Sequence, residues 1–210
     1  MKMYFIEVNT IWNDEMYKKI RDNISIERQN KIDKLRYPID KKLSLFAELL
    51  IRKGICSFSD VEYNKINFLY NEYGKPYIEG KNCYFSLSHT KNAIFVAISS
   101  YEVGVDIERI KKINYKIIER FFTIEEKMYI ERSRNRDRAF YDIWTKKEAY
   151  IKYMGTGLHT SLNSFNILEK KYLIKSFQIR DYQVSICSEE DIQVLLIDIL
   201  SEKELLQLYV

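Results

Sequence analysis

The sequence predicts a mixed α+β protein. Residues 39–53 and 137–153 carry apolar side chains at the spacing of a helix, whereas 93–99 is a short apolar run typical of a buried strand. Helical and strand-like stretches do not alternate as they do in a parallel α/β fold, and we find no internal repeat. Six Gly and two Pro in 210 residues exclude long low-complexity segments.

Residues 1–108 are predicted to form a strand, three helices and then three strands. Asn13 and Asp14 begin the first helix, and Ser25 is a suitable N-cap for the second. Pro38 stands in the first turn of the third helix, where its missing N–H costs nothing. In chain order these elements cover residues 3–8, 14–20, 26–36, 39–53, 83–88, 93–99 and 103–108, with a turn at 71–76.

The chain after residue 108 is predicted to begin with helices and to continue with strands. Its strongest helix, 137–153, ends at a glycine stop formed by Gly155 and Gly157. Ser201 begins a final helix, with Glu204 completing a capping box. The helices are expected at 115–122, 124–133 and 137–153, and the strand-like runs at 164–168, 172–179, 182–187 and 192–198.

Charge and layout divide the chain into two halves. The boundary is predicted near residues 99–102, which gives the subdomains 1–101 and 102–210. Residues 18–53 hold eleven Lys and Arg against five Asp and Glu, a local charge of +6 in a chain of net charge +4. This basic segment is either a site for an anion or a solvated helix surface.

Several protein classes are excluded by what the sequence lacks. No apolar stretch approaches the roughly 18 residues of a membrane span, and the N-terminus has no signal-peptide pattern. Cys56, Cys83 and Cys187 form no CxxC pair, so we expect a reducing, cytoplasmic location. The absence of P-loop, GxGxxG, HExxH and GxSxG motifs argues against the enzymes that depend on them.

The segment Gly104-Val105-Asp106-Ile107-Glu108 is the first candidate for chemistry. On a strand, Asp106 and Glu108 share one face while Val105 and Ile107 face the core. Two carboxylates side by side suit Mg²⁺, which prefers hard oxygen ligands. The same pattern also fits an amphipathic strand with an acidic outer face.

The helix around residues 144–152 is the second candidate. Trp144, Glu148 and Lys152 are four residues apart and share one face, so Glu148 is a third candidate carboxylate. Lys152 is suited to neutralise a phosphate or to protonate a leaving oxygen. The alternative is an ordinary Glu–Lys surface pair beside a core tryptophan.

The third candidate is the strand end at residues 85–90. His89 leaves this strand between two hydroxyl side chains, where an imidazole can donate to a phosphate oxygen or take part in acid–base catalysis. Lys75 offers a cation on the nearby Gly-Lys-Pro turn. His159, the other histidine, lies in a polar loop and is interpreted as a surface residue.

Taken together, the ordered motifs resemble the 4′-phosphopantetheinyl transferase superfamily. The main ones are F-S-x-S-H at 85–89, G-V-D-I-E at 104–108 and W-x-x-K-E-A-x-x-K at 144–152. Shorter matches lie at 72–76, 120–126 and 155–158. Length and layout resemble the longer, surfactin-synthetase-activator (Sfp) type. This resemblance implies a pseudo-dimer of two similar α+β subdomains with the active site at their interface.

The resemblance implies an enzyme that moves the 4′-phosphopantetheine arm of coenzyme A (CoA) onto a serine of an apo acyl or peptidyl carrier protein, releasing 3′,5′-ADP. Asp106, Glu108 and Glu148 would hold Mg²⁺ on the CoA pyrophosphate. Glu148 would help deprotonate the serine, directly or through a metal-bound water, and Lys152 would stabilise the leaving phosphate. Lys147 is expected near a phosphate and Trp144 in packing.

The resemblance also implies a set of basic and hydroxyl side chains that hold the CoA 3′-phosphate. The matching positions are Arg28, Lys31, Ser44, Lys75, Ser88 and His89. Part of the basic segment 18–53 would then be an anion site. Ser86 stands where the family pattern often has Asn, and Glu126 is expected to have a supporting role near the site.

The length and the pseudo-dimer layout favour a monomer, because the shorter relatives need three chains to build the same cleft. Nucleic-acid and membrane partners are not expected. Two other functions remain open at this point. One is a Mg²⁺-dependent phosphodiester hydrolase that uses the same three carboxylates. The other is a non-catalytic module that binds nucleic acid or acidic proteins through residues 18–53.

Overall fold

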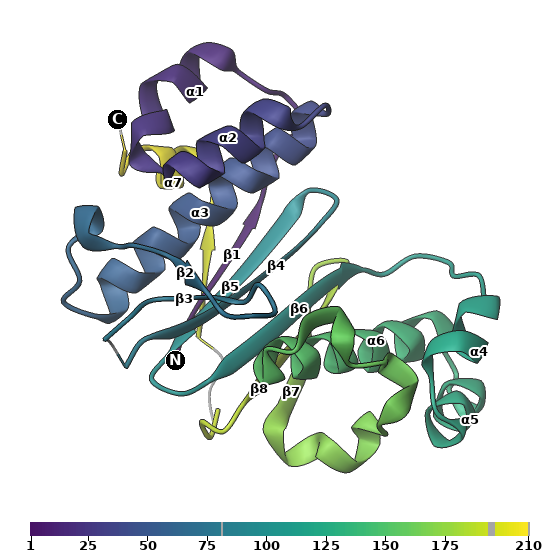
Figure 1. Cartoon of the computed structure of the whole chain (residues 1–210). Helices are drawn as coiled ribbons and strands as arrows, with labels where there is room; N and C mark the ends of the chain where they lie inside the picture. The colour runs from purple at the N-terminus through teal and green to yellow at the C-terminus, as the bar shows by residue number, and fades with distance from the viewer. Residues whose placement is uncertain (81, 193–195, 210) are drawn as a thin grey trace.

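The computed structural model describes residues 1–80, 82–192 and 196–209, and in them the chain has a mixed α+β fold (Figure 1). A four-stranded sheet has the order β4-β5-β1-β9, a three-stranded sheet has the order β6-β8-β7, and β2 pairs with β3. The strands are β1 (Lys2–Glu7), β2 (Leu69–Tyr70), β3 (Pro76–Tyr77), β4 (Tyr84–Thr90), β5 (Ala93–Ser99), β6 (Val103–Arg109), β7 (Ile174–Ile179), β8 (Tyr182–Ser188) and β9 (Ile197–Leu200). The α+β fold class is confirmed.

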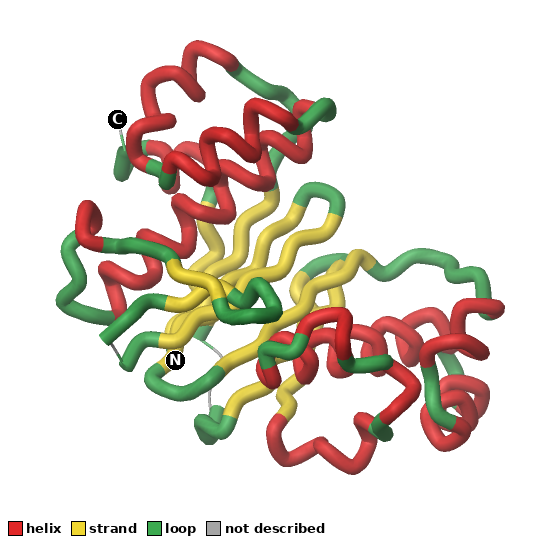
Figure 2. The backbone as a smooth tube through the Cα atoms, in the orientation of Figure 1, coloured by secondary structure: helices red, strands yellow, loops and turns green. Residues whose placement is uncertain are grey.

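The helices lie on the outer sides of the strands, which run through the middle of the molecule (Figure 2). In chain order they are α1 (Asp14–Ile20), α2 (Ile26–Lys34), α3 (Pro38–Phe58), α4 (Lys116–Phe121), α5 (Ile124–Arg132), α6 (Arg136–Met154) and α7 (Glu202–Leu206). No helix in the described part of the chain is both long enough and apolar enough to cross a membrane.

The first half is built on the long helix α3, which packs against β5 and β1. Leu45, Leu49 and Ile55 on this helix are fully buried. The predicted helix starts are confirmed, with Ser25 as the N-cap of α2 and Pro38 in the first turn of α3. Helix α3 runs further than expected, to Phe58, because apolar side chains continue to face the sheet.

The second half is built on α6, which packs against β6 and β8. The helix begins after Asn135, whose side chain caps the first turn, and ends at Gly155 in the left-handed conformation, with φ +69°. Only glycine adopts that conformation without a steric cost. On the outer side of α6, Trp144 stacks against Phe140, with ring centroids 5.7 Å apart. The packing role expected for Trp144 is thus observed.

The two halves share a buried apolar cluster. It joins Phe5 and Phe95 of the first sheet to Val105 and Val184 of the second. Strands β4 and β6 also lie next to each other where the halves meet (Figure 1). The shared cluster packs the two sheets against each other. The boundary between β4 and β6, here called the seam, carries predicted site residues.

The end of the chain crosses back to the first half. The predicted division into residues 1–101 and 102–210 does not include this return. Strand β9 pairs in parallel with β1, placing Ile199 opposite Phe5. Leu205 is buried in the core of the first half, and the Tyr209 hydroxyl donates to the carbonyl of Leu49 at 2.7 Å. The final helix has the predicted capping box between Ser201 and Glu204.

One predicted strand is wrong and another lies partly outside the described residues. Residues 164–168 form no strand; short 3₁₀ turns cover Leu162–Ser164 and Ile167–Leu173. Polar side chains stabilise these turns locally, since Ser164 Oγ donates to the Ser161 carbonyl and Asn166 Oδ1 accepts from the Leu168 N–H. Of the run 192–198, residues 193–195 lie outside the described part of the chain.

Candidate active site

Asp106 lies at the centre of the seam between the halves. Its Oδ1 accepts hydrogen bonds from Ser88 Oγ at 2.7 Å and from Lys152 Nζ at 2.8 Å. Its Oδ2 is buried and has no hydrogen-bond partner among the residues that the structure describes. A buried carboxylate oxygen is costly unless something pairs with it. The arrangement therefore leaves one acceptor for a group that is not part of the chain.

Gly104 explains how β6 brings its acidic face against α6. Gly104, Asp106 and Glu108 alternate along the strand and share one face. A Cβ atom at Gly104 would lie 2.0 Å from the carbonyl oxygen of Ala149 and 2.2 Å from the backbone nitrogen of Tyr153. Only a residue without a side chain permits this contact between strand and helix.

Glu108 and Glu148 complete the acidic cluster predicted from the sequence. The pKa of Glu108 is raised by burial and by Asp106, although a hydrogen bond from Thr90 lowers it in part. The pKa of Glu148 is raised by burial, by Asp106 and by Glu108, against the lowering effect of Lys152. Burial is thus the largest cause of both raised pKa values, and the charge of Asp106 adds to each of them.

The acidic cluster is not arranged as a finished metal centre. Within the described ranges, no three His, Cys, Asp or Glu side chains are placed as a metal-binding group. Lys152 pairs with one oxygen of Asp106 at 2.8 Å and so supplies a positive charge itself. The donor set nevertheless fits Mg²⁺, because all three candidate ligands are carboxylates and Asp106 Oδ2 is free of other bonds within the described residues.

Replacing Glu148 with glutamine is expected to stabilise the metal-free protein at neutral pH. Because folding raises the pKa of Glu148 above its usual 4.5, the ionised side chain costs stability at every pH above that range. Thermal unfolding at pH 7 should show Tm higher by roughly 2 °C or more.

The pH dependence distinguishes this effect from a change in packing. The gain should shrink as the pH falls toward 4.5 and disappear below it, since glutamate is then protonated in both the folded and the unfolded states. Glu131→Gln, on the exposed side of α5, serves as the control and should leave Tm unchanged. A gain that is the same at all pH values would contradict the electrostatic explanation.

A basic groove of about 550 Å³ lies beside the cluster and is lined by four of the predicted CoA-binding residues, Arg28, Lys31, Ser44 and His89. Arg28 donates to Ser44 Oγ at 3.2 Å. The pKa of His89 is lowered by desolvation of the imidazole and by the positive charges of Lys152, Lys31 and Arg28. Glu27 and Asp40 also line this groove, so it is the group of cations around His89, and not the groove as a whole, that favours an anion.

A second groove of about 250 Å³ lies next to the basic groove. Its lining includes Lys75 and Lys152, and it shares Pro76 and Leu87 with the first groove. The Lys75 ammonium pairs with Glu102 at 2.6 Å. The two grooves are therefore neighbours, and Lys152 links the second one to Asp106.

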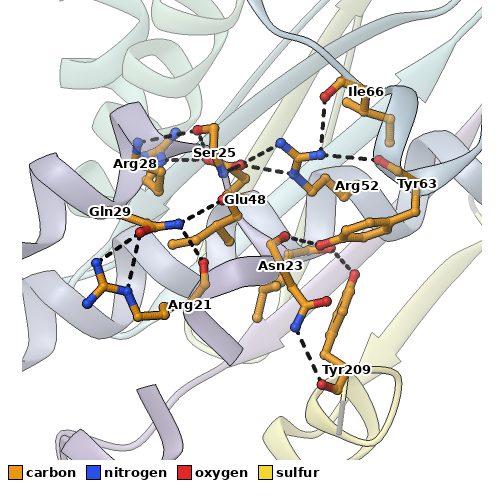
Figure 3. Close-up of polar contacts among 12 residues, drawn as sticks. Arg21, Asn23, Ser25, Arg28, Gln29, Glu48, Arg52, Tyr63, Ile66 and Tyr209 are labelled. Carbon is orange, nitrogen blue, oxygen red and sulfur yellow. Dashed lines mark hydrogen bonds and ion pairs between the residues drawn. The ribbon is translucent and has the colours of Figure 1, made fainter. Parts of the chain in front are cut away.

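Glu48 is a site residue that sequence reasoning missed (Figure 3). Its side chain is 1% exposed and accepts from Arg28 Nε at 3.1 Å and from Arg52 Nε at 2.9 Å. It also accepts from the backbone and hydroxyl of Ser25 at the start of α2. Glu48 thereby fixes the Arg28 guanidinium at the groove. An i,i+4 Glu–Arg pair inside an apolar helix was the available signal.

Replacing Glu48 with alanine is expected to lower the free energy of unfolding by about 3 kcal/mol, because removing one partner leaves the other buried charge unpaired. Arg52, the charge left behind, is 6% exposed. Urea unfolding monitored by circular dichroism measures the change. Glu62→Ala, which breaks an exposed pair with Lys65, should cost less than about 1 kcal/mol; equal losses would contradict the role of burial.

Two family models match the chain on either side of the seam. The 4′-phosphopantetheinyl transferase superfamily model matches residues 102–197, and a model described as 4′-phosphopantetheinyl transferase, N-terminal, matches residues 12–102. The 4′-phosphopantetheinyl transferase gsp of Aneurinibacillus migulanus is 34% identical over 167 residues, which are 79% of this chain and 70% of the relative. The chain belongs to the 4′-phosphopantetheinyl transferase superfamily.

Further relatives agree with the Sfp type. The 4′-phosphopantetheinyl transferase Sfp of Bacillus subtilis strain 168 is 30% identical over 171 residues, covering 80% of this chain and 76% of the relative. The transferase ffp of Bacillus subtilis is 32% identical, with the same two coverages. The resemblance inferred from the motifs is confirmed, and the chain is a phosphopantetheinyl transferase.

In this transferase, Lys147 does not line the grooves as expected for a phosphate-binding residue. Its side chain is 0% exposed, and its Nζ lies 2.5 Å from Glu126 Oε1 and 2.7 Å from the carbonyl of Phe165. Glu126 also accepts from the backbone N–H of Ile167 at 2.7 Å. Because the pair is sealed inside the second half, we assign it to structure and omit Lys147 from the CoA contacts proposed below.

Ser88 also lies in a different place from the one expected for a phosphate contact. It is 6% exposed on β4 and donates its hydroxyl proton to Asp106. Its neighbour His89 points instead into the basic groove. Alternation along the strand accounts for the difference, since successive side chains face opposite sides. Ser88 therefore positions a carboxylate of the transferase.

Proposed function

We propose that this chain transfers the 4′-phosphopantetheine arm of CoA to a serine of an apo acyl or peptidyl carrier protein, releasing 3′,5′-ADP with the help of Mg²⁺. One observation carries the proposal: the groove that holds Arg28 and Lys31 lies next to a second groove lined by Lys152, and Lys152 pairs with Asp106 at 2.8 Å. CoA has two anionic groups for these two places, because its ribose carries a phosphate at the 3′ position and the pyrophosphate at the 5′ position.

The basic groove is the proposed place for the 3′-phosphate. Arg28 keeps part of its planar guanidinium available while Glu48 and Ser44 hold the rest. Such a fork recognises phosphate oxygens through paired hydrogen bonds. Lys31 and His89 lie on the same groove and add donors. Lys75, in the connecting groove, is the proposed contact along the rest of the nucleotide.

Asp106, Glu108 and Glu148 are the proposed Mg²⁺ ligands. Burial and the charge of Asp106 raise the pKa of Glu108 and of Glu148, and Asp106 holds a buried oxygen without a partner in the described residues. A Mg²⁺ ion bound there would stabilise the negative charge on the pyrophosphate during transfer. No single half of the chain supplies both this acidic cluster and the basic groove.

The transfer step assigns a role to two side chains of α6. The carrier serine oxygen forms a bond to the β-phosphorus of CoA as the bond to the bridging oxygen breaks, and that oxygen leaves on 3′,5′-ADP. Glu148, whose raised pKa makes it a stronger base, takes the serine proton directly or through a water. Lys152 Nζ stabilises or protonates the leaving phosphate.

The organisation of the enzyme follows from the same geometry. We infer that residues 1–101 hold CoA and residues 102–210 supply the acids, with β9 and α7 returning to support the first half. A monomer suffices, since one chain supplies both grooves and all three carboxylates. A cytoplasmic location is supported by Cys56, Cys83 and Cys187, all of which are free thiols.

Release of 3′,5′-ADP tests the reaction. Purified protein is incubated with Mg²⁺ and CoA, with and without an apo carrier protein, and the nucleotides are separated by chromatography. The proposal predicts 3′,5′-ADP only when carrier is present, in amounts equal to the carrier modified. Release without carrier would instead show a phosphodiester hydrolase and would overturn the proposal.

A further inference from the structure

The seam between the halves is joined by hydroxyl side chains. Strands β4 and β6 lie side by side but belong to different sheets (Figure 1). Alternate residues of β4, namely Ser86, Ser88 and Thr90, turn their hydroxyls toward β6. Each makes one hydrogen bond across the seam: Ser86 Oγ with the N–H of Val105 at 3.0 Å, Ser88 Oγ with Asp106 at 2.7 Å and Thr90 Oγ1 with Glu108 at 2.8 Å.

The outermost of these bonds reaches a carboxylate of the proposed metal site. Thr90 donates to Glu108 Oε2, which leaves Oε1 of the same carboxylate for another partner. Strand β6 alone does not fix this side chain, since a glutamate on a strand has three rotatable bonds. The hydrogen bond from β4 supplies the missing constraint, and it comes from the opposite half of the chain.

We propose that Thr90 is a positioning residue that aims Glu108 at the Mg²⁺ ion. The proposal rests on the function proposed above and assigns Thr90 a role in it. Carboxylates that bind metals are commonly held by hydrogen bonds from an outer shell, and loss of such a partner weakens metal binding. The half that holds CoA would thereby also set the geometry of an acid on the other half.

The residue type at position 90 fits this role. Threonine has a branched Cβ, which restricts its χ1 angle on a strand and keeps the hydroxyl pointed in one direction. Valine has nearly the same shape without the donor, whereas serine keeps the donor without the methyl group. The pair Thr90→Val and Thr90→Ser therefore separates the hydrogen bond from the packing of the strand.

The test is a titration of Mn²⁺, as a probe for Mg²⁺, into protein saturated with CoA, with free Mn²⁺ counted by electron paramagnetic resonance and CoA alone as the blank. Thr90→Val is expected to weaken Mn²⁺ binding by roughly 10-fold or more. Thr90→Ser should bind close to the wild-type value. Thr10→Val, an exposed loop position, is the matched control.

Two results would overturn the inference. One is Mn²⁺ binding by Thr90→Val equal to that of the wild type, and the other is equal weakening in Thr90→Val and Thr90→Ser. The Mn²⁺ titration needs no carrier protein, so its outcome does not depend on the transfer reaction. A wild type that binds Mn²⁺ but modifies no carrier would contradict the proposed function and leave the Thr90 result standing.

Discussion

Replacing Asp106 with asparagine is expected to lower the rate of phosphopantetheine transfer by at least about 10³-fold, which corresponds to several kcal/mol of lost charge stabilisation in the transition state. The substitution keeps the shape of the side chain but removes the charge that pairs with Lys152 and, in the proposed reaction, with Mg²⁺. The amide oxygen of asparagine can still accept from Ser88 and Lys152, which both donate to Oδ1, but the NH₂ group then replaces Oδ2 and cannot bind a cation.

The measurement is kcat/KM with CoA and an apo carrier, combined with thermal unfolding to show that the variant is folded. Asp60→Asn, at an exposed position after α3, serves as the control and should transfer at the wild-type rate. A folded Asp106→Asn protein that keeps more than a tenth of the wild-type rate would show that this carboxylate is not central to the reaction.

Replacing Gly104 with alanine is expected to abolish both stable folding and transfer. The new methyl group would meet the backbone of α6 at Ala149 and Tyr153, at 2.0 Å and 2.2 Å. Backbone atoms of a helix cannot rotate away as a flexible side chain can, so α6 has to move off β6. A loss of more than about 4 kcal/mol in the free energy of unfolding is expected, together with separation of Glu148 from Asp106.

Gly80→Ala separates this clash from the ordinary effect of losing a glycine. Gly80 has φ +71°, and apart from its chain neighbours no atom of the described residues lies within 4 Å of an added Cβ, so the substitution should cost only about 1–2 kcal/mol of backbone strain. Urea unfolding and soluble yield compare the two variants. If Gly104→Ala is no less stable than Gly80→Ala, the close approach of β6 and α6 does not hold in solution.

Local signals in the sequence were sufficient to predict much of the fold and the acidic face of the site. Ser25, Pro38 and Ser201 mark helix starts that depend on neighbouring residues alone, and all three are observed. The alternation of Asp106 and Glu108 along a strand is equally local. The basic groove was reached through the family motifs, which placed Arg28 and its partners near one anion.

Contacts between residues far apart in the chain could not be predicted from the sequence. Burial of Lys147 depends on Glu126, a residue of another helix, and only the packed second half shows that the pair excludes solvent. The bond between Thr90 and Glu108 and the return of β9 to β1 also join segments far apart in the chain. Residues 164–168 form no strand, contrary to the prediction, because polar side chains there bond to the backbone locally.

The intact mass of an apo carrier protein, measured after incubation with this chain, Mg²⁺ and CoA, tests the central claim most directly. The carrier is expected to gain the mass of one phosphopantetheine group, and a carrier with its target serine changed to alanine should gain none. The Asp106→Asn protein should add none within the time in which the wild type completes the reaction. Absence of any gain with several acyl and peptidyl carriers would contradict the proposed function.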